Sequence, residues 1–253
     1  MSYKICVALQ VKTGNVDENK ALIDKALQSK PDLIELRWDY IDSIEHLTEG
    51  FVNALLDHIQ PDIPVISTFR ATSEGGQTQI DEDQRFEILK MLMSAQPQYL
   101  DIEMRTDPGF LRTVCQNSFS KKIKIIFSYH DFEKTPAIEE AKNIIQNFLK
   151  SLVTVTTMNT DKSGLFLYKV IFNATKFEDN FVPIKLCKFF TKQGEDRNII
   201  CFCMGEAGVF SRLMSVKYGS FLTYASVAEG TAPGQVHIDK IREFHQIMAT
   251  ENQ

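Results

Sequence analysis

Lys169 is the residue whose surroundings are best suited to chemistry in this chain. It lies inside the run Leu165–Phe172, in which all the remaining residues are apolar or aromatic. Such a run is typical of a strand that is buried on both faces. Burial removes the hydration of an ammonium group, so we expect a neutral, nucleophilic amine to be accessible near neutral pH. An amine of this kind can attack a ketone or an aldehyde and form a Schiff base. A simpler interpretation is a lysine whose stem is buried and whose head group extends to water.

Charged and polar side chains also gather at the ends of five other apolar runs. Since the carboxyl ends of parallel strands meet at one face, these residues are expected to converge there. The residues concerned are Glu35, Arg37 and Asp39, then Arg70 and Glu74, Asp101 and Glu103, Ser128 to Asp131, and Met204 followed by Arg212.

Each of these residues also has a structural interpretation. Glu35 and Arg37 could form a structural ion pair, and His130 could be a hydrogen-bonded structural histidine. Asp101 and Glu103 could serve only to neutralise arginines. A purely structural account does not explain why successive strands all place charge at the same end.

Together, these residue types support a defined reaction. A buried lysine can convert a ketone to an imine, which acts as an electron sink, and a nearby histidine can move a proton on the adjacent carbon. Arginine and glutamate side chains can bind a carboxylate and hydroxyl groups. The expected substrate is therefore a small, polar, anionic ketone or aldehyde.

The elements that must position these residues alternate along the chain. Between the apolar runs lie segments with apolar residues at the three- and four-residue spacing of helices, such as Phe51, Leu55, Leu56 and Ile59. Eight such repeats predict an α/β fold, a (β/α)8 TIM barrel that forms a single domain over residues 1–253. The expected strands are Lys4–Val11, Leu33–Tyr40, Pro64–Arg70, Tyr99–Met104, Lys124–His130, Leu165–Ala174, Asn198–Gly205 and Phe221–Val227.

An open doubly wound sheet is the competing architecture. It usually carries a glycine-rich phosphate loop after its first strand, and residues 11–15 do not form one. Thr135 followed by Pro136 predicts a helix start. The stretch Ser151–Gly164 is long and rich in β-branched residues, so we expect an excursion before the sixth strand that could contain a short extra hairpin.

Composition narrows the class of protein. The formal net charge of −5 and a pI near 5.6 give no electrostatic signature of nucleic-acid binding. No apolar stretch approaches the roughly 20 residues of a membrane span, and no signal peptide is apparent. The five cysteines lie mostly in apolar runs, which indicates reduced thiols and a cytoplasmic protein. No cysteine and histidine spacing typical of a zinc site is present, so we expect neither a metal nor a cofactor.

Several motifs carry a family resemblance. The chain resembles type I 3-dehydroquinate dehydratase, an enzyme of the shikimate pathway, over essentially its whole length. Six motifs in register are far more specific than any one of them. They are Glu35-Leu36-Arg37, Ser67-Thr68-Phe69-Arg70 followed by Glu74-Gly75-Gly76, Ser128-Tyr129-His130-Asp131-Phe132, the lysine Lys169, Met204-Gly205 with Ser211-Arg212-Leu213, and Thr231-Ala232-Pro233-Gly234-Gln235.

The resemblance implies a homodimeric barrel that converts 3-dehydroquinate to 3-dehydroshikimate by syn elimination. Lys169 would form the imine, His130 would move the protons, and Glu74 would orient His130. Arg212 would hold the substrate carboxylate, Glu35, Arg37 and Arg70 would bind ring hydroxyls, Met204 would pack on the ring, and Thr231 and Gln235 would close over the ligand as a lid.

The chain departs from the family pattern in two places. Thr231 stands where serine is usual, and the connection before the sixth strand is long, which makes Lys162 and Lys176 rival lysines. Both rivals have polar neighbours and so lack the desolvation argument. Two other functions are compatible with a buried lysine in a barrel: an imine-forming aldolase, which usually binds phosphate on glycine-rich loops, and a barrel that binds a ligand without turnover. An arginine such as Arg212 suits a carboxylate better, and the joint presence of Lys169, His130 and Glu74 argues against a binding-only barrel.

Overall fold

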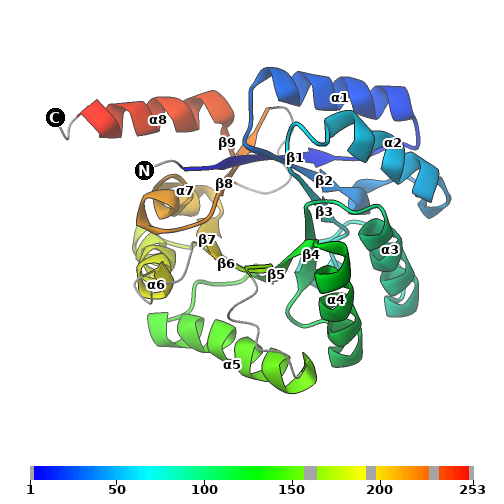
Figure 1. Ribbon diagram of the computed structural model, residues 1–253. Coiled ribbons are helices and arrows are strands. Elements are labelled where there is room, and N and C mark those ends of the chain that lie inside the picture. Colours follow the sequence, from blue (N-terminus) through cyan, green and yellow to red (C-terminus); the bar gives the residue numbers. More distant parts are fainter. Residues whose placement is uncertain (1–2, 157–163, 192–197, 228–233, 251–253) are drawn as a thin grey trace.

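A ring of parallel strands with helices on its outer side forms the body of the protein (Figure 1). The computed structural model describes residues 3–156, 164–191, 198–227 and 234–250. The barrel strands are β1 (Ile5–Gln10), β2 (Leu33–Arg37), β3 (Val65–Thr68), β4 (Tyr99–Glu103), β5 (Lys124–Asp131), β6 (Phe166–Asn173), β7 (Ile199–Met204) and β8 (Thr223–Ser226). The predicted (β/α)8 barrel is therefore confirmed.

The strands follow one another in space as they do in the sequence. The hydrogen-bonded order is β7-β6-β5-β4-β3-β2-β1-β8-β9, and every pair is parallel. The segment just before β8 reaches β7, where the backbone N–H of Phe221 donates to the carbonyl of Ile199 at 2.7 Å. A two-residue strand, β9 (Val236–His237), extends the sheet beside β8.

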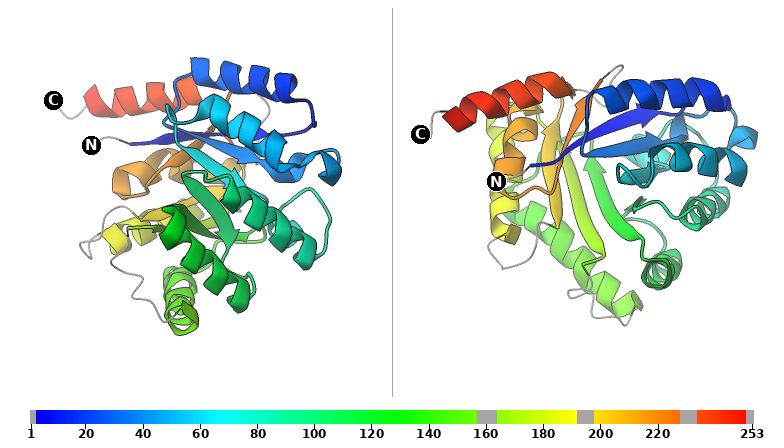
Figure 2. Two further views of the ribbon diagram at one scale, coloured as in Figure 1. Left: turned by 45° about the vertical axis from the view of Figure 1, so that its right-hand side comes forward. Right: turned by 45° about the horizontal axis from the view of Figure 1, so that its top comes forward.

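The helices form the outer layer of the barrel. One of them, α8, lies near α1, and Arg242 of α8 donates to the carbonyls of Ser29 and Lys30 at 2.6 and 2.5 Å (Figure 2). The helices are α1 (Val16–Gln28), α2 (Glu49–Ile59), α3 (Glu82–Ser94), α4 (Pro108–Lys121), α5 (Ile138–Thr156), α6 (Phe181–Thr191), α7 (Val209–Met214) and α8 (Ile238–Thr250).

Alternation of side chains along β6 places Lys169 inside the barrel. Phe166, Tyr168, Val170 and Phe172 belong to the large core between sheet and helices. Leu167 and Ile171, which flank Lys169 at two-residue spacing, belong to a smaller separate cluster formed by inward-facing positions of the strands. Lys169 therefore points into the barrel interior.

Three predicted boundaries were wrong. Residues 151–156 continue helix α5, although we expected an excursion from Ser151, and residues 157–163 lie outside the described part of the chain. Helix α5 begins at Ile138, because the hydroxyl of Thr135 donates to the carbonyl of Asn173 at 2.8 Å instead of capping a helix. The second strand is also shorter than expected, since Trp38–Tyr40 form a 3-10 turn after Arg37.

Leu55 tests the packing of the helices on the sheet. Its side chain is fully buried on α2, so Leu55→Ala should lower the free energy of unfolding by about 2–5 kcal/mol, from lost apolar burial and the cavity left behind. Urea unfolding followed by circular dichroism measures this change. Asn53→Ala, at an exposed position of the same helix, serves as the control and should change stability by less than about 0.5 kcal/mol. Equal effects of the two substitutions would contradict the packing described.

Candidate active site

The carboxyl ends of the barrel strands surround a pocket of about 770 Å³. Nine of the ten predicted site residues line it, and they come from six different strands or from the segments that follow them. The tenth, Thr231, lies outside the described residues. The nine are Glu35, Arg37, Arg70, Glu74, His130, Lys169, Met204, Arg212 and Gln235.

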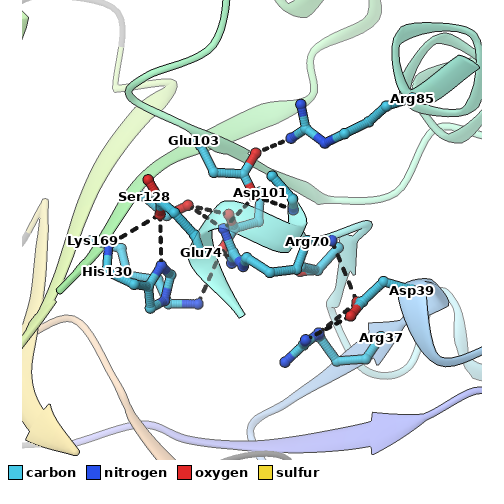
Figure 3. Close-up of polar contacts among 12 residues, drawn as sticks. Arg37, Asp39, Arg70, Glu74, Arg85, Asp101, Glu103, Ser128, His130 and Lys169 are labelled. Atoms are coloured by element: carbon cyan, nitrogen blue, oxygen red, sulfur yellow. Dashed lines mark hydrogen bonds and ion pairs between the residues drawn. The ribbon is translucent and has the colours of Figure 1, made fainter. Parts of the chain in front are cut away.

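The Lys169 ammonium lies among oxygen atoms within the barrel (Figure 3). Its Nζ atom donates to Asp101 Oδ2 at 3.0 Å and to the hydroxyl of Tyr224 at 3.2 Å, and it lies 3.7 Å from Glu35 Oε1. Two carboxylates and one phenol hydroxyl therefore surround the Lys169 head group.

Asp101 joins Lys169 to a longer chain of buried charges (Figure 3). Arg70 binds Asp101 Oδ2 at 2.9 Å and Glu103 Oε1 at 2.8 Å, and Arg85 of α3 pairs with the other oxygen of Glu103. Burial alone would raise the pKa of Asp101, but the charges of Arg70 and Lys169 hold that pKa well below its usual range. Asp101 and Glu103 thus neutralise an arginine, as the structural interpretation proposed, and Asp101 also contacts the lysine.

Ser128 hydrogen-bonds to two members of this network. Its hydroxyl donates to Asp101 Oδ1 at 2.6 Å and accepts from Arg70 Nη1 at 2.6 Å. The pKa of Arg70 is raised above its usual value: burial opposes the charged form, but Asp101 outweighs that effect. The guanidinium of Arg70 is therefore held in a fixed orientation before any ligand binds.

His130 and Glu74 form the second functional unit of the pocket (Figure 3). Glu74 Oε2 lies 3.0 Å from His130 Nδ1 and also accepts the backbone N–H of His130 at 3.0 Å. Burial, together with the charges of Arg70 and Lys169, lowers the pKa of His130 well below its usual value. The imidazole is therefore neutral near pH 7, as a proton acceptor must be.

Glu74 itself is unusually basic for a carboxylate. Burial raises the pKa of Glu74 to about 7, and the attraction of Arg70 and Arg105 offsets only part of that rise. A left-handed Gly75 directly follows it, where an added Cβ would clash with the ring of Phe132. Glycine at this position lets the chain turn sharply beneath Phe132 and keeps Glu74 against His130.

Glu35 and Arg37 have different partners, although both come from β2. Arg37 makes a bidentate pair with Asp39 at 2.7 and 2.8 Å, so the alternative interpretation of a structural ion pair between Glu35 and Arg37 does not describe Arg37. The 3-10 turn after Arg37 brings Asp39 back onto it. Glu35 Oε1 instead accepts the hydroxyl of Thr68 at 2.7 Å.

On the side formed by β7 and the segment after it, the pocket wall combines apolar side chains with the guanidinium of Arg212. The guanidinium of Arg212 lies 4.5 Å from the ring centre of Phe202, and Met204 lines the same side. Burial lowers the pKa of Arg212 to about 10, which leaves it charged at pH 7. A cation on an apolar wall suits a ligand with one carboxylate and a hydrocarbon ring.

Tyr224 was missed in the sequence. A tyrosine within the apolar run Phe221–Val227 resembles an ordinary core residue, but its hydroxyl contacts both Lys169 and Glu35.

Of the rival lysines, Lys176 is exposed at the start of a short 3-10 helix, and Lys162 lies outside the described residues.

Within the described ranges, no group of three or more His, Cys, Asp or Glu residues is arranged to hold a metal ion. None of the helices in the same ranges is long and apolar enough to cross a membrane.

The fold and the pocket define a (β/α)8-barrel enzyme whose site sits at the carboxyl ends of the strands. A family model described as type I 3-dehydroquinase matches residues 5–252. A 3-dehydroquinate dehydratase of Methanococcus vannielii is 30% identical over 244 residues, which are 95% of this chain and 97% of that protein. The chain therefore belongs to the type I 3-dehydroquinase family, a family of hydro-lyases.

Solved structures agree with this assignment. A type I 3-dehydroquinate dehydratase from Clostridium difficile has a TM-score of 0.81 at 27% identity, with 98% of this chain and 93% of that chain covered. The 3-dehydroquinate dehydratase of Geobacillus kaustophilus shares the fold with a TM-score of 0.85 at 21% identity, covering 100% of this chain and 93% of that one.

The raised pKa of Glu74 predicts a pH-dependent contribution to stability. The folded state binds the Glu74 proton more tightly than the unfolded state, so this contribution is complete below about pH 4.5 and is lost as the pH rises through about 7. Glu74→Gln removes the titration. Its stability relative to the unsubstituted protein should therefore increase by up to roughly 3 kcal/mol between these pH values.

Urea unfolding at a series of pH values measures this difference. Glu87→Gln, at an exposed position of α3, serves as the control and should follow the unsubstituted protein at every pH. Parallel stability curves for Glu74→Gln and the unsubstituted protein would show that Glu74 does not titrate in this range.

Proposed function

We propose that this protein converts 3-dehydroquinate to 3-dehydroshikimate through a Schiff base between Lys169 and the C3 ketone of the substrate. Membership of the type I family supports the substrate and the overall reaction. The observation that carries the mechanism is a buried lysine that lines the same pocket as His130. The Clostridium difficile relative was solved with covalently modified comenic acid, which further supports covalent chemistry in this family.

The reaction follows from the electron-withdrawing effect of the imine. The Lys169 amine attacks C3, and the resulting carbinolamine loses water to give a protonated imine. This imine acidifies the C2 hydrogen, which His130 removes, and the electron pair forms an enamine. The enamine then expels the C1 hydroxyl, which leaves as water with a proton from His130. Hydrolysis of the conjugated imine releases the product and restores Lys169.

The pair of His130 and Glu74 suits this proton transfer. If Nδ1 of His130 donates to Glu74, its Nε2 atom is left to accept a proton in the pocket. The lowered pKa of His130 keeps the ring neutral before it takes the C2 proton. Once the imidazolium forms, the adjacent Glu74 carboxylate stabilises its charge.

The remaining predicted residues would bind the substrate. Arg212 supplies the cation for the carboxylate, and Met204 packs on the ring. Glu35, Arg37 and Arg70 bind the hydroxyls, and the fixing of Arg37 by Asp39 supports this role because it pre-organises the guanidinium donors. We assign Gln235, and Thr231 in the same motif, to a lid that closes over the ligand; Gln235 lines the pocket, which supports this role.

Three further features belong to the proposal. The barrel would be a single catalytic domain, would pair with a second copy as a homodimer, and would act in the cytoplasm. All five cysteines are buried free thiols, which supports a reducing compartment.

Light scattering coupled to size-exclusion chromatography tests the proposed dimer. We expect the mass of two chains, and a mass of one chain would contradict the dimer.

Substitution of the lysine tests the covalent mechanism. Lys169→Met preserves side-chain length but removes the nucleophile, so turnover should fall by roughly 1000-fold or more. The ultraviolet absorbance of the conjugated product measures turnover, and thermal unfolding checks the fold. Lys176→Met is the matched control at an exposed lysine and should retain full activity. A Lys169→Met variant as active as the control would overturn the Schiff-base mechanism.

Substitution of the histidine separates imine formation from proton removal. With saturating 3-dehydroquinate, His130→Ala should still yield a borohydride-reducible adduct on Lys169, while turnover falls by about 10²–10⁴-fold. Intact-mass spectrometry measures the adduct. His46→Ala, with a half-exposed side chain, provides the control. Unchanged turnover in His130→Ala would remove this residue from proton transfer.

A further inference from the structure

The hydroxyl of Tyr224 lies within hydrogen-bond distance of both Lys169 and Glu35. This tyrosine lies on β8, is buried, and lines the pocket. Its hydroxyl oxygen is 3.2 Å from Lys169 Nζ and 3.3 Å from Glu35 Oε1. The three groups come from β6, β8 and β2, so the barrel itself holds them together.

The directions of these hydrogen bonds follow from the chemistry of the groups. An ammonium group can only donate, so the Tyr224 oxygen accepts from Lys169. An ionised carboxylate can only accept, so the Tyr224 hydroxyl donates its own hydrogen to Glu35. The line from lysine through tyrosine to glutamate is thus arranged for a proton to move along it.

Only an unprotonated amine can attack a ketone, so a Lys169 ammonium must first give a proton to a nearby acceptor. The direct path to Glu35 spans 3.7 Å, which exceeds hydrogen-bond distance. Asp101 is nearer, at 3.0 Å, but it already binds Arg70 and Ser128. The pKa of Asp101 is held well below its usual range, so Asp101 is a poor proton acceptor.

We propose that Tyr224 relays a proton from the Lys169 ammonium to the Glu35 carboxylate and so releases the amine that attacks the substrate. This inference rests on the proposed Schiff-base function. One Nζ–H bond breaks as a new O–H bond forms on Tyr224, while the original Tyr224 O–H bond breaks and an O–H bond forms on Glu35. The products are a neutral amine, an unchanged tyrosine and a neutral carboxylic acid.

The environment of Tyr224 suits a group that passes a proton on without keeping a charge. Burial, and secondarily the Glu35 charge, raises the pKa of Tyr224 well above its usual value, so a tyrosinate does not accumulate. Thr68 donates to the same Glu35 oxygen at 2.7 Å and fixes the acceptor. When the product imine is hydrolysed, the same path returns the proton to Lys169.

Tyr224→Phe tests the relay because it removes the hydroxyl and retains the ring. The full-length protein is mixed with saturating 3-dehydroquinate and quenched with borohydride at millisecond intervals, and intact-mass spectrometry gives the rate of adduct formation. We expect this rate to fall by about 10- to 100-fold. Thermal unfolding shows whether the variant is folded. Tyr99→Phe is the control, since Tyr99 is also buried in the inner cluster but lies at the start of β4.

The outcomes separate the relay from the proposed function. Absence of an adduct in the unsubstituted protein would overturn the Schiff-base mechanism and the relay with it. Equal adduct rates for the unsubstituted protein and Tyr224→Phe would overturn the relay alone. A Tyr224→Phe variant that changes KM but leaves the adduct rate at saturation intact would likewise reduce Tyr224 to a binding residue.

A measurement on the unsubstituted protein avoids any dependence on the variant. The rate of adduct formation is determined in mixtures of light and heavy water. Two protons move together in the relay, so the rate should depend on the deuterium fraction along a curve. The loss of rate expected for Tyr224→Phe requires this transfer to limit imine formation, so a straight line, or no isotope effect, would contradict the relay.

Discussion

An ammonium group inside a barrel can be tolerated only if negative charge lies close to it, and this constraint organises the whole site. Lys169 has Asp101 and Glu35 near it, and the Asp101 charge is balanced in turn by Arg70. Arg70 then requires Glu103, which pairs with Arg85 on α3. The reactive lysine is thus tied, through alternating charges, to the outer helix layer.

The same network separates two kinds of carboxylate. Asp101 and Asp39 pair directly with arginines and hold these cations in place, and the charges of Arg70 and Lys169 keep the pKa of Asp101 well below its usual range. Glu74 and Glu35 have other surroundings. Burial raises the pKa of Glu74 to about 7, and Glu35 is bonded to two hydroxyls, those of Thr68 and Tyr224. One pocket thereby combines fixed positive charge, which would bind an anion, with the groups that would move protons in the proposed elimination.

The sequence predicted the eight strands and the convergence of charge at their carboxyl ends, because buried parallel strands are continuous apolar runs in which a polar residue is conspicuous. Prediction from the sequence failed where the conformational preference of single residues differed from the conformation that packing in the fold imposes. The β-branched residues after Ser151 suggested an extended segment, but residues 151–156 continue a long amphipathic helix. Tyr224 escaped notice because an aromatic residue in a strand resembles core, and its hydroxyl partners are remote in sequence. The pairing of Arg37 with Asp39 depended on a turn that alternation could not reveal.

The central claim is that Lys169 is the nucleophile, and the most direct test is to locate the covalent bond. The protein would be incubated with 3-dehydroquinate and sodium borohydride in the presence of EDTA, digested, and its peptides sequenced by mass spectrometry. The account predicts a single reduced adduct on the peptide that contains Lys169. An adduct on Lys162 or Lys176, or no adduct in a sample that still dehydrates the substrate, would contradict it.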